Sequence, residues 1–476
     1  MKKIKTIIED CYIIEVNKFN DDRGYFSTFY AEKDSLENEL GSSIKGIVQG
    51  SRSLSEKGVL RGLHFQKDPF CQSKIVECLN GGVLDVVVDL RRDSSSYKKW
   101  ISVELTPENG RQLLIPRGCA HGFLSLKDNT LFQYLVDSDY SKIHEDGIFW
   151  NDHEIGIDWQ FDKYGIEKIL LSEKDKNMGF LSNKSLSFFK KKRYLVTGVN
   201  GQLGYDIVRE LNKKNIYDIL ALDINDMDIT DKRIVNKIIS EYKPEVVFHC
   251  AAWTNVENAE DCKEQCYKVN VEGTKNIVNA CRNIDCKLIY ISTDYVFDGE
   301  KDGLYEINDF TNPKNVYGKS KVAGENFVRS YEKSFIVRTS WLFGINGKNF
   351  INTMLKLSKT NEELDVVGNQ IGSPTYTVDL AKTLIDISNT EKYGTYHVTN
   401  SGYCSWAELA KYIFEINNKN VKVNICDSYP SKAKRPSNSK LSSKSLIENG
   451  FEELPYWKNA VDRYNEESYQ KIITKK

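Results

Sequence analysis

RYLVTGVNGQLG, residues 193–204, is the stretch that decides the fold of the second half of the chain. It joins an apolar strand to a glycine turn and then to the start of a helical pattern. Glycine is needed where a backbone turns tightly and lies close to a pyrophosphate, and a helix N-terminus offers free N–H groups to phosphates. The spacing is GxxGxxG rather than GxGxxG, but its place between a strand and a helix predicts a dinucleotide site.

Strands and helices alternate on both sides of this turn. Expected strands cover residues 194–197, 219–222 and 246–250, and expected helices cover 202–212 and 232–242. This alternation is typical of βαβ units on a parallel sheet, so we expect an α/β Rossmann-type, doubly wound fold with a smaller substrate-binding part. Asp223 follows the second strand, where an acid can hold a ribose hydroxyl; a strand-end turn is the alternative interpretation.

A candidate catalytic group lies further along this half. An expected strand over residues 288–293 ends in Ser292 and Thr293, at the sheet edge where open α/β sheets bind ligands. Tyr317 and Lys321 are spaced i,i+4 and so share one helix face. A phenol titrates near pH 10, and a nearby cation would lower its pKa. YxxxK alone is common on helix surfaces; beside a nucleotide turn it indicates acid–base chemistry.

The first half of the chain is typical of a β-protein. Strand-like runs recur at residues 74–79, 83–90, 100–105, 112–115 and 131–136, separated by turn residues. This predicts an all-β sandwich or barrel. The segments GVLRGLHFQ and IPRGCAHGF fit the two halves of a cupin-like jelly-roll barrel, but a metal cupin needs HxH where this chain has His64-Phe65-Gln66. We therefore expect no metal here.

The two halves predict two unrelated domains, 1–182 and 193–476, joined by a polar linker at 183–192. The 476 residues carry 66 Lys and Arg against 67 Asp and Glu, a balance that argues against nucleic acid or an anionic membrane as partner. No apolar run is long enough to cross a membrane. The 11 cysteines are scattered without a repeated CxxC, so we expect a reduced, cytoplasmic protein.

Residues 193–376 resemble the dTDP-4-dehydrorhamnose reductases, a family of extended short-chain dehydrogenases/reductases. The matching segments are TGVNGQLG, LDINDMDITD, AAWTNVENAE, ISTDYVFDG, NVYGKSKVAGE, VRTSWLFG and VGNQIGSPT. The resemblance implies that Tyr317, Lys321 and Thr293 are catalytic and that NADPH or NADH is the cofactor. With Gly204 and Asp223, the implied cofactor-binding residues are Gly198, Gly201, Gln202, Leu203, Asp228, Ile229, Ala251, Ala252, Tyr317 and Lys321. Trp253 and Glu257 would contact substrate, where the family usually has Tyr and Asp.

Residues 1–178 resemble the dTDP-4-dehydrorhamnose 3,5-epimerases. The matching segments are DDRGYFSTFY, GVLRGLHFQ, QSKIVECLNGGVLDVVVDLRRDS, IPRGCAHGF, FQYLVDSDY, GIFWNDHEIGIDW and LSEKD. The resemblance implies that His64 is a general base with Asp175 as its carboxylate partner, and that Tyr134 is the general acid. The implied substrate-binding residues are Arg23, Gln49, Arg61, Lys74, His121 and Tyr140. Ser51 stands where the family usually has Asn, and Cys119 where it has Phe.

The product of such an epimerase is the substrate of such a reductase, so we expect a bifunctional enzyme that converts dTDP-4-dehydro-6-deoxy-D-glucose into dTDP-L-rhamnose. The resemblance also implies a homodimer through the cupin-like domain. A uridine-linked or other deoxyhexose, a nucleotide-binding regulatory protein without turnover, and a metal-dependent cupin oxygenase are the alternatives. The preference between NADH and NADPH, and a Mg²⁺ ion at the reductase, are left open.

Overall fold

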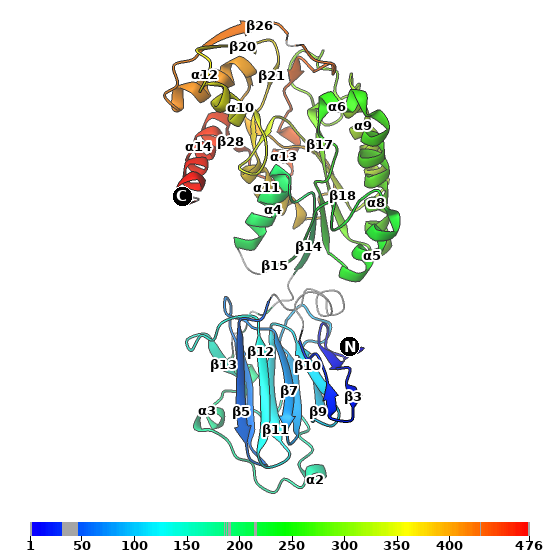
Figure 1. Cartoon of the computed structure of the whole chain (residues 1–476), viewed down its shortest axis with the longest axis vertical. Helices are drawn as coiled ribbons and strands as arrows, with labels where there is room; N and C mark the ends of the chain where they lie inside the picture. Colours follow the sequence, from blue (N-terminus) through cyan, green and yellow to red (C-terminus); the bar gives the residue numbers. More distant parts are fainter. Residues whose placement is uncertain are drawn as a thin grey trace. The chain divides into compact units, whose positions relative to one another are not determined.

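A computed structural model describes residues 2–30, 46–184, 186, 188, 192–213, 217–428 and 430–474. The chain forms two compact units, Met1–Lys191 and Lys192–Lys476 (Figure 1). None of the helices described has the length and apolarity needed to span a lipid bilayer.

The first unit is built from two antiparallel sheets. The six-stranded sheet has the order β1 (Lys2–Lys5), β2 (Tyr12–Glu15), β10 (Arg111–Ile115), β7 (Lys74–Asn80), β12 (Thr130–Val136), β5 (Gln49–Ser55). The five-stranded sheet has the order β13 (Glu145–Gly147), β6 (Leu60–Gln66), β11 (Cys119–Ser125), β8 (Val83–Asp89), β9 (Trp100–Leu105). Apolar side chains of the two sheets meet in a shared core that includes Val76, Phe132 and Val87. The predicted all-β, cupin-like fold is confirmed, and each of the strands predicted here is present.

The segment expected to be a polar linker is partly built into the first unit. Leu186 and Phe188 are buried, and the Phe188 ring packs edge-on against Phe65 at 5.2 Å between centroids. The backbone N–H of Arg92 also donates to the Phe188 carbonyl oxygen. The expectation of a solvated segment is therefore wrong at these positions, because alternate apolar residues lie on the barrel core. The basic residues 189–191 lie outside the described residues.

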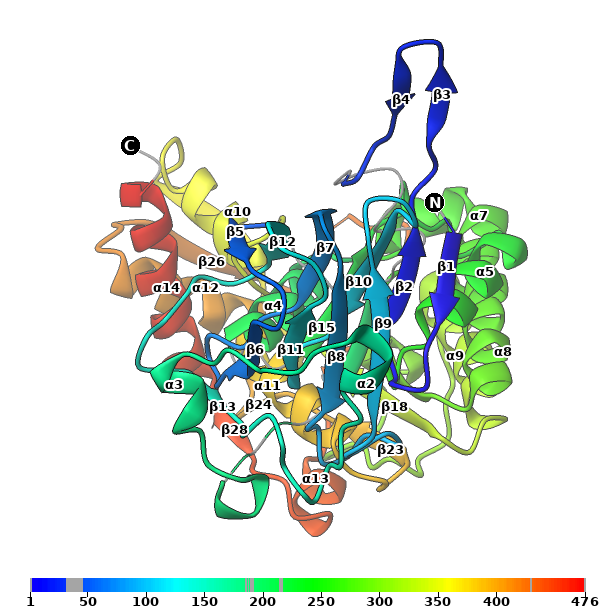
Figure 2. The ribbon, with the colours of Figure 1, turned by 90° about the horizontal axis from the view of Figure 1, so that it is seen from below.

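Short elements complete the first unit. They are the hairpin β3 (Phe19–Asp21) and β4 (Gly24–Phe26), the helices α2 (Phe161–Tyr164) and α3 (Glu173–Lys176), and the single turn η1 (Leu181–Asn183). The hairpin stands away from the two sheets of its unit (Figure 2), and Phe19, Tyr25 and Phe26 on it are exposed.

The second unit has a central parallel sheet covered on both faces, which confirms the doubly wound fold. Its strand order is β15 (Tyr217–Leu222), β14 (Lys192–Thr197), β16 (Val246–His249), β17 (Lys287–Thr293), β18 (Ser334–Thr339), β23 (Gly394–His397). One face carries α4 (Gln202–Lys213) and α11 (Thr377–Ser388); the other carries α5 (Lys232–Tyr242), α8 (Thr274–Ile284) and α9 (Val316–Arg329) (Figure 1). The chain leaves β14 for β15 on one side and then returns to β16 on the other. Ligands bind open α/β sheets at such a switch point.

A smaller part with its own apolar core follows within this unit. It is formed by α10 (Phe350–Leu357), α12 (Trp406–Ile416), α14 (Trp457–Thr474), β20 (Glu363–Val367) and β26 (Lys422–Cys426). The remaining strands are β19 (Leu342–Phe343), β21 (Ile371–Gly372), β22 (Thr375–Tyr376), β24 (Asn400–Ser401), β25 (Cys404–Ser405), β27 (Asn438–Ser439) and β28 (Leu454–Tyr456). The remaining helical elements are α6 (Val256–Asp261), α7 (Lys263–Tyr267), η2 (Lys268–Gly273), η3 (Asp294–Val296) and α13 (Lys444–Glu448).

Candidate functional site

A histidine–carboxylate pair joins β6 to α3 in the first unit. His64 projects from β6, and its Nε2 lies 2.5 Å from Oδ1 of Asp175 on α3. The Ser172 hydroxyl donates to Asp175 Oδ2 at 2.8 Å and also caps α3. Burial acts to raise the pKa of Asp175, but the His64 and Ser172 hydrogen bonds outweigh it and hold that pKa below its usual range. The pair can therefore hold an ionised carboxylate against a ring that accepts a proton.

A second pair, which the sequence analysis did not find, lies on the neighbouring strand. His121 of β11 is the register partner of His64, and its Nε2 lies 2.9 Å from Oδ2 of Asp85 on β8. Both side chains are buried. Burial lowers the pKa of His121 and raises that of Asp85, since the ring and the carboxyl group are both desolvated. The signal was present in the sequence: Asp85 is a lone acid inside the apolar run VLDVVV.

Tyr134 approaches His121 from the opposite sheet. It lies on β12, with its ring 6.1 Å from the His121 ring and edge-on to it. Burial raises the pKa of Tyr134 to about 12, so its hydroxyl keeps its proton at neutral pH. Val136 is two residues after Tyr134 on β12, so the two side chains point to the same face of the sheet. Lys74 and Gln49 are the register partners of Val136 on the neighbouring strands and therefore share that face.

The other expected substrate contacts of this unit are spread over its surface. Arg61 is exposed and donates to the Ser55 hydroxyl and the Leu54 carbonyl oxygen. The Tyr140 hydroxyl donates to Glu145. Arg23 lies in the projecting hairpin, with its side chain 90% exposed and paired with Asp21. The structure therefore does not bring Arg23 to His64 within one chain.

The glycine turn of the second unit lies at the switch point between β14 and β16. Gly198 has φ +71°, and a Cβ placed there would lie 2.7 Å from the backbone nitrogen of Ala251, so only glycine fits. The amide of Gly201 donates to the Gly198 carbonyl oxygen at 3.0 Å, and α4 begins at Gln202. The turn thus leaves a bare backbone surface beside a helix N-terminus, which fits the pyrophosphate of a dinucleotide.

The remaining residues expected to hold a cofactor fall into two groups. Asp223 and Asp228 are accessible and follow β15; the amide of Asn225 donates to Asp223 and that of Thr230 to Asp228. Ala251 and Ala252 follow β16, and the Ala251 amide donates to the Thr197 hydroxyl. The side chains of Leu203 and Ile229 lie in the core, so these residues can offer only backbone to a ligand. The Gln202 side chain accepts from the Gly344 amide.

Thr293, Tyr317 and Lys321 converge at the carboxyl end of β17. Thr293 ends that strand, and Tyr317 and Lys321 lie on α9, whose first turn is capped by Asn315. The ammonium of Lys321 lies 4.0 Å from the centroid of the Tyr290 ring, and burial lowers its pKa to about 7. Burial also raises the pKa of Tyr317, with the charge of Asp294 acting in the same direction. The expected lowering of this pKa by Lys321 is therefore not found.

Comparisons with known proteins agree with this geometry. The model for the RmlD substrate binding domain matches residues 192–470, and that for dTDP-4-dehydrorhamnose 3,5-epimerase matches residues 5–183. The chain belongs to both families, as a fusion. A dTDP-4-dehydrorhamnose reductase of Aggregatibacter actinomycetemcomitans is 42% identical over 52% of this chain and 89% of its own. The crystal structure of the Bacillus anthracis reductase in complex with NADP is 43% identical and superposes with a TM-score of 0.57 over 58% of this chain and 99% of its own.

The spore coat polysaccharide biosynthesis protein SpsK of Bacillus subtilis is also similar to the reductase domain: it is 40% identical over 58% of this chain and 97% of its own length. The family resemblance given by the sequence motifs is thus confirmed for both domains.

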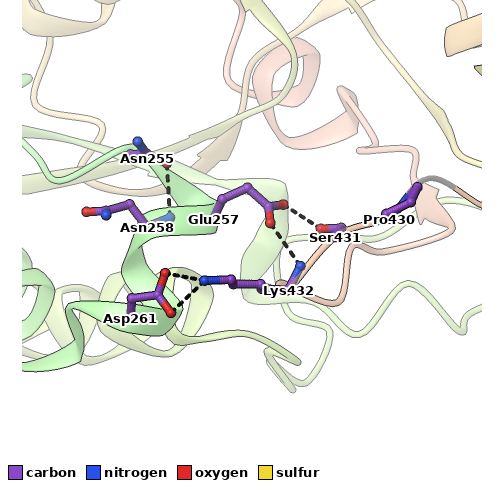
Figure 3. A pocket seen from close by; sticks show the side chains of 7 residues that line it. All are labelled: Asn255, Glu257, Asn258, Asp261, Pro430, Ser431 and Lys432. Carbon is purple, nitrogen blue, oxygen red and sulfur yellow. Dashed lines mark hydrogen bonds and ion pairs between the residues drawn. The ribbon is translucent and has the colours of Figure 1, made fainter.

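A cleft of about 630 Å³, lined mostly by polar residues, lies in the reductase domain between α6 and the segment 430–432 (Figure 3). Glu257 accepts from the Lys432 amide and from the Ser431 hydroxyl on one side of it. The same carboxylate accepts from Nη2 of Arg435 at 2.9 Å. These hydrogen bonds lower the pKa of Glu257 to about 2. Glu257 therefore ties the segment 431–435 to α6, rather than standing free for a ligand.

Arg435 and Tyr295 extend the site of the reductase domain beyond the residues predicted from sequence. Nη1 of Arg435 donates to the Tyr295 hydroxyl at 3.2 Å, and the Tyr295 ring packs edge-on against Tyr317 at 5.8 Å. Trp253, a predicted substrate contact, packs in the same small cluster as Tyr317. Arg435 is far from Tyr317 in sequence, so no local motif could reveal it. No group of three or more His, Cys, Asp or Glu in the described ranges is arranged to hold a metal ion.

Proposed function

We propose that the chain is a bifunctional enzyme of dTDP-L-rhamnose synthesis. The first domain would invert C3 and C5 of dTDP-4-dehydro-6-deoxy-D-glucose, and the second would reduce the C4 ketone of the resulting sugar with NADH or NADPH. The observation that carries this proposal is that one chain holds two separate sets of proton-handling groups, His64–Asp175 with Tyr134, and Tyr317 with Thr293 and Lys321. The names of the relatives supply the sugar and the nucleotide.

The epimerisation chemistry follows from the two faces of the barrel interior. A C–H beside a ketone is acidic because the enolate places its charge on oxygen. With Nε2 of His64 bound to Asp175, Nδ1 is left to take the proton. Tyr134 lies on the opposite sheet and retains its proton, so it can return one from the other face and invert the carbon. Lys74, His121 and Arg61 supply positive charge or hydrogen bonds for the enolate oxygen and the diphosphate.

In the reduction, Tyr317 would protonate the C4 oxygen while Thr293 binds the sugar and Lys321 binds the cofactor ribose. A nicotinamide held there would supply the hydride for C4. The residues that would hold the dinucleotide are Gly198, Gly201 and the start of α4 at the pyrophosphate, and Asp223 at the adenosine ribose. Two acids, Asp223 and Asp226, meet at the end of β15, where the Asp223 amide donates to Asp226 Oδ2. Their negative charge favours NADH, because it would repel the extra phosphate of NADPH.

The exposed hairpin β3–β4 supports a proposal about assembly. Its aromatic side chains and Arg23 are exposed and distant from His64 in the same chain, which suits a homodimer in which the hairpin of one chain covers its partner. Arg23 and Tyr140 would then bind the nucleotide end of the substrate. The described cysteines are free thiols, in keeping with a cytoplasmic setting. A Mg²⁺ requirement is tested directly by chelation.

The test is incubation of the whole chain with dTDP-4-dehydro-6-deoxy-D-glucose and NADH in D₂O. We expect dTDP-L-rhamnose with deuterium at C3 and C5 and protium at C4, identified by NMR, because C3 and C5 exchange with solvent and C4 receives hydride. A reduced sugar without deuterium at C3 and C5 would contradict the epimerase assignment. Exchange without consumption of NADH or NADPH would contradict the reductase assignment.

A further inference from the structure

Asp294 is a buried carboxyl group directly after Thr293. It is 4% exposed, and the Thr293 hydroxyl donates to its Oδ1 at 2.9 Å. Its Oδ2 is buried and has no hydrogen-bond partner in the part of the chain that the structure describes. An ionised carboxylate with an unpaired buried oxygen is unfavourable, so this environment favours the neutral acid. Burial raises the pKa of Asp294 to about 6, although the nearby Ser439 and Thr293 hydroxyls act to lower it.

This acid lies against the element that carries Tyr317. α9 packs directly on η3, since a side chain at Gly318 would collide with the carbonyl oxygen of Tyr295. The Tyr295 and Tyr317 rings are in contact, and the Asp294 charge and the Thr293 hydroxyl both act on the Tyr317 pKa. The Thr293 hydroxyl bonds to Asp294 and to the amide of Tyr295, whose ring packs on the Tyr317 ring, so it lies between the acid and the residues around the phenol.

A threonine hydroxyl has a single hydrogen, so it donates to one group at a time. In the structure that hydrogen goes to Asp294, and the Thr293 oxygen accepts from the Tyr295 amide at 3.2 Å. If Asp294 is protonated, its O–H can donate to the Thr293 oxygen, and the Thr293 hydrogen is free for another acceptor. The protonation of Asp294 thus decides the direction in which Thr293 donates.

We propose that Asp294 is the internal acid that restores the proton of Tyr317 through the Thr293 hydroxyl, which rests on the proposed reductase function. When Tyr317 gives its proton to the C4 oxygen, it becomes a phenolate. The Thr293 O–H bond then breaks toward the phenolate oxygen, while the Asp294 O–H bond breaks toward the Thr293 oxygen. Tyr317 and Thr293 are restored, Asp294 is left as a carboxylate, and it takes a proton from water when the product leaves. No electrons are transferred in this relay.

The surroundings of Asp294 define what a pH profile must report. The titratable groups around it are Tyr295 of its own element and Tyr317 of α9; Arg435 reaches it through Tyr295, and Ser439 of β27 lies on the other side. Arg435 keeps its charge at every pH used, and burial raises the pKa of both tyrosines. An ionisation that lowers the reduction rate as pH rises from 5 to 8 is therefore assigned to Asp294 or to the buried Lys321.

Asp294→Asn separates proton supply from geometry, because the amide can donate to Thr293 but cannot release a proton. We measure reduction by the full-length variant, with epimerised sugar supplied by an excess of full-length Tyr317→Phe chain. We expect kcat to fall by about tenfold or more and KM to stay within about twofold. We also expect the loss of rate near pH 6 to disappear, whereas a loss near pH 7 that belongs to Lys321 remains. Asp298→Asn is the matched control: this acid lies in the same segment but accepts from Tyr305 and Asn312. We expect the control to keep the wild-type profile.

A folded Asp294→Asn variant that keeps the wild-type kcat, or that still loses rate near pH 6 as the wild type does, would overturn the relay. If wild-type chain fails to reduce the sugar at all, the proposed function fails instead. NADH binding and thermal unfolding report whether the variant is folded. If it is not, a proton inventory of wild-type kcat in H₂O–D₂O mixtures decides: a relay through Thr293 moves several protons together and gives a curved plot, whereas a linear plot overturns the proposal.

Discussion

Asp175→Asn removes the negative charge beside His64 while keeping the size of the side chain. The charged ring that forms when His64 takes a proton lies 2.5 Å, Nε2 to Oδ1, from this carboxylate. At an effective dielectric constant of about 20 and roughly 4 Å between charge centres, the lost attraction is about 4 kcal/mol. The His64 side chain is 29% exposed, so solvent weakens the effect, and we expect C3 and C5 exchange to slow by about 10²–10³-fold.

The assay is the rate of deuterium uptake at C3 and C5 from D₂O, followed by NMR without NADH or NADPH. Glu173→Gln is the matched control, because Glu173 lies on the same helix, its side chain is 82% exposed and its carboxylate pairs with Lys176 on the surface. Reduction of sugar that has already been epimerised is the internal control for a folded chain. Wild-type exchange by a folded Asp175→Asn variant would refute the assignment of His64 as the base.

Three further predictions concern the reductase domain. Gly198→Ala places a side chain at φ +71° against the Ala251 backbone. We expect it to destabilise this domain by more than about 1 kcal/mol in urea unfolding and to abolish NADH binding in a fluorescence titration. Unchanged binding would contradict the role of this turn in holding the cofactor. Asp223→Ala removes a negative charge and should raise the ratio of kcat/KM for NADPH to that for NADH by about tenfold. An unchanged ratio would contradict the assignment of Asp223 to the cofactor site. Glu257→Gln should lower the thermal stability of the domain at pH 7. Because the folded pKa of Glu257 is about 2, below its ordinary value of 4.5, its contribution is present above about pH 4.5 and is lost as pH falls toward 2; a difference that persists at pH 2 would contradict this.

The fold could be predicted from the sequence wherever periodicity and turns act locally. The strands of the barrel and the βαβ order around residues 193–250 were found because apolar runs and glycine turns mark them. The burial of Leu186 and Phe188 was missed because two apolar residues in a polar segment give no periodic signal. The projecting hairpin β3–β4 was missed because a single sequence does not distinguish its exposed aromatic residues from aromatic residues of the core.

The candidate sites were predictable only in part. The glycine turn and the Tyr317–Lys321 spacing are local patterns, whereas the pairing of His64 with Asp175 joins residues far apart and came from the family resemblance. The contacts of Asp85 and Arg435 join residues that are far apart in the sequence. Asp294 is the sequence neighbour of Thr293, but its burial depends on tertiary structure. Burial also reversed one expectation, since it raises the Tyr317 pKa that Lys321 was expected to lower.

A mixing experiment tests most directly whether one chain carries two independent proton-handling sites. Full-length His64→Ala and Tyr317→Phe chains are assayed separately and together with dTDP-4-dehydro-6-deoxy-D-glucose and NADH. We predict that neither chain alone forms dTDP-L-rhamnose and that the mixture does, because the Tyr317→Phe chain supplies epimerised sugar to the intact reductase site of the other. No product from a mixture of folded chains, or full product from either chain alone, would contradict the account.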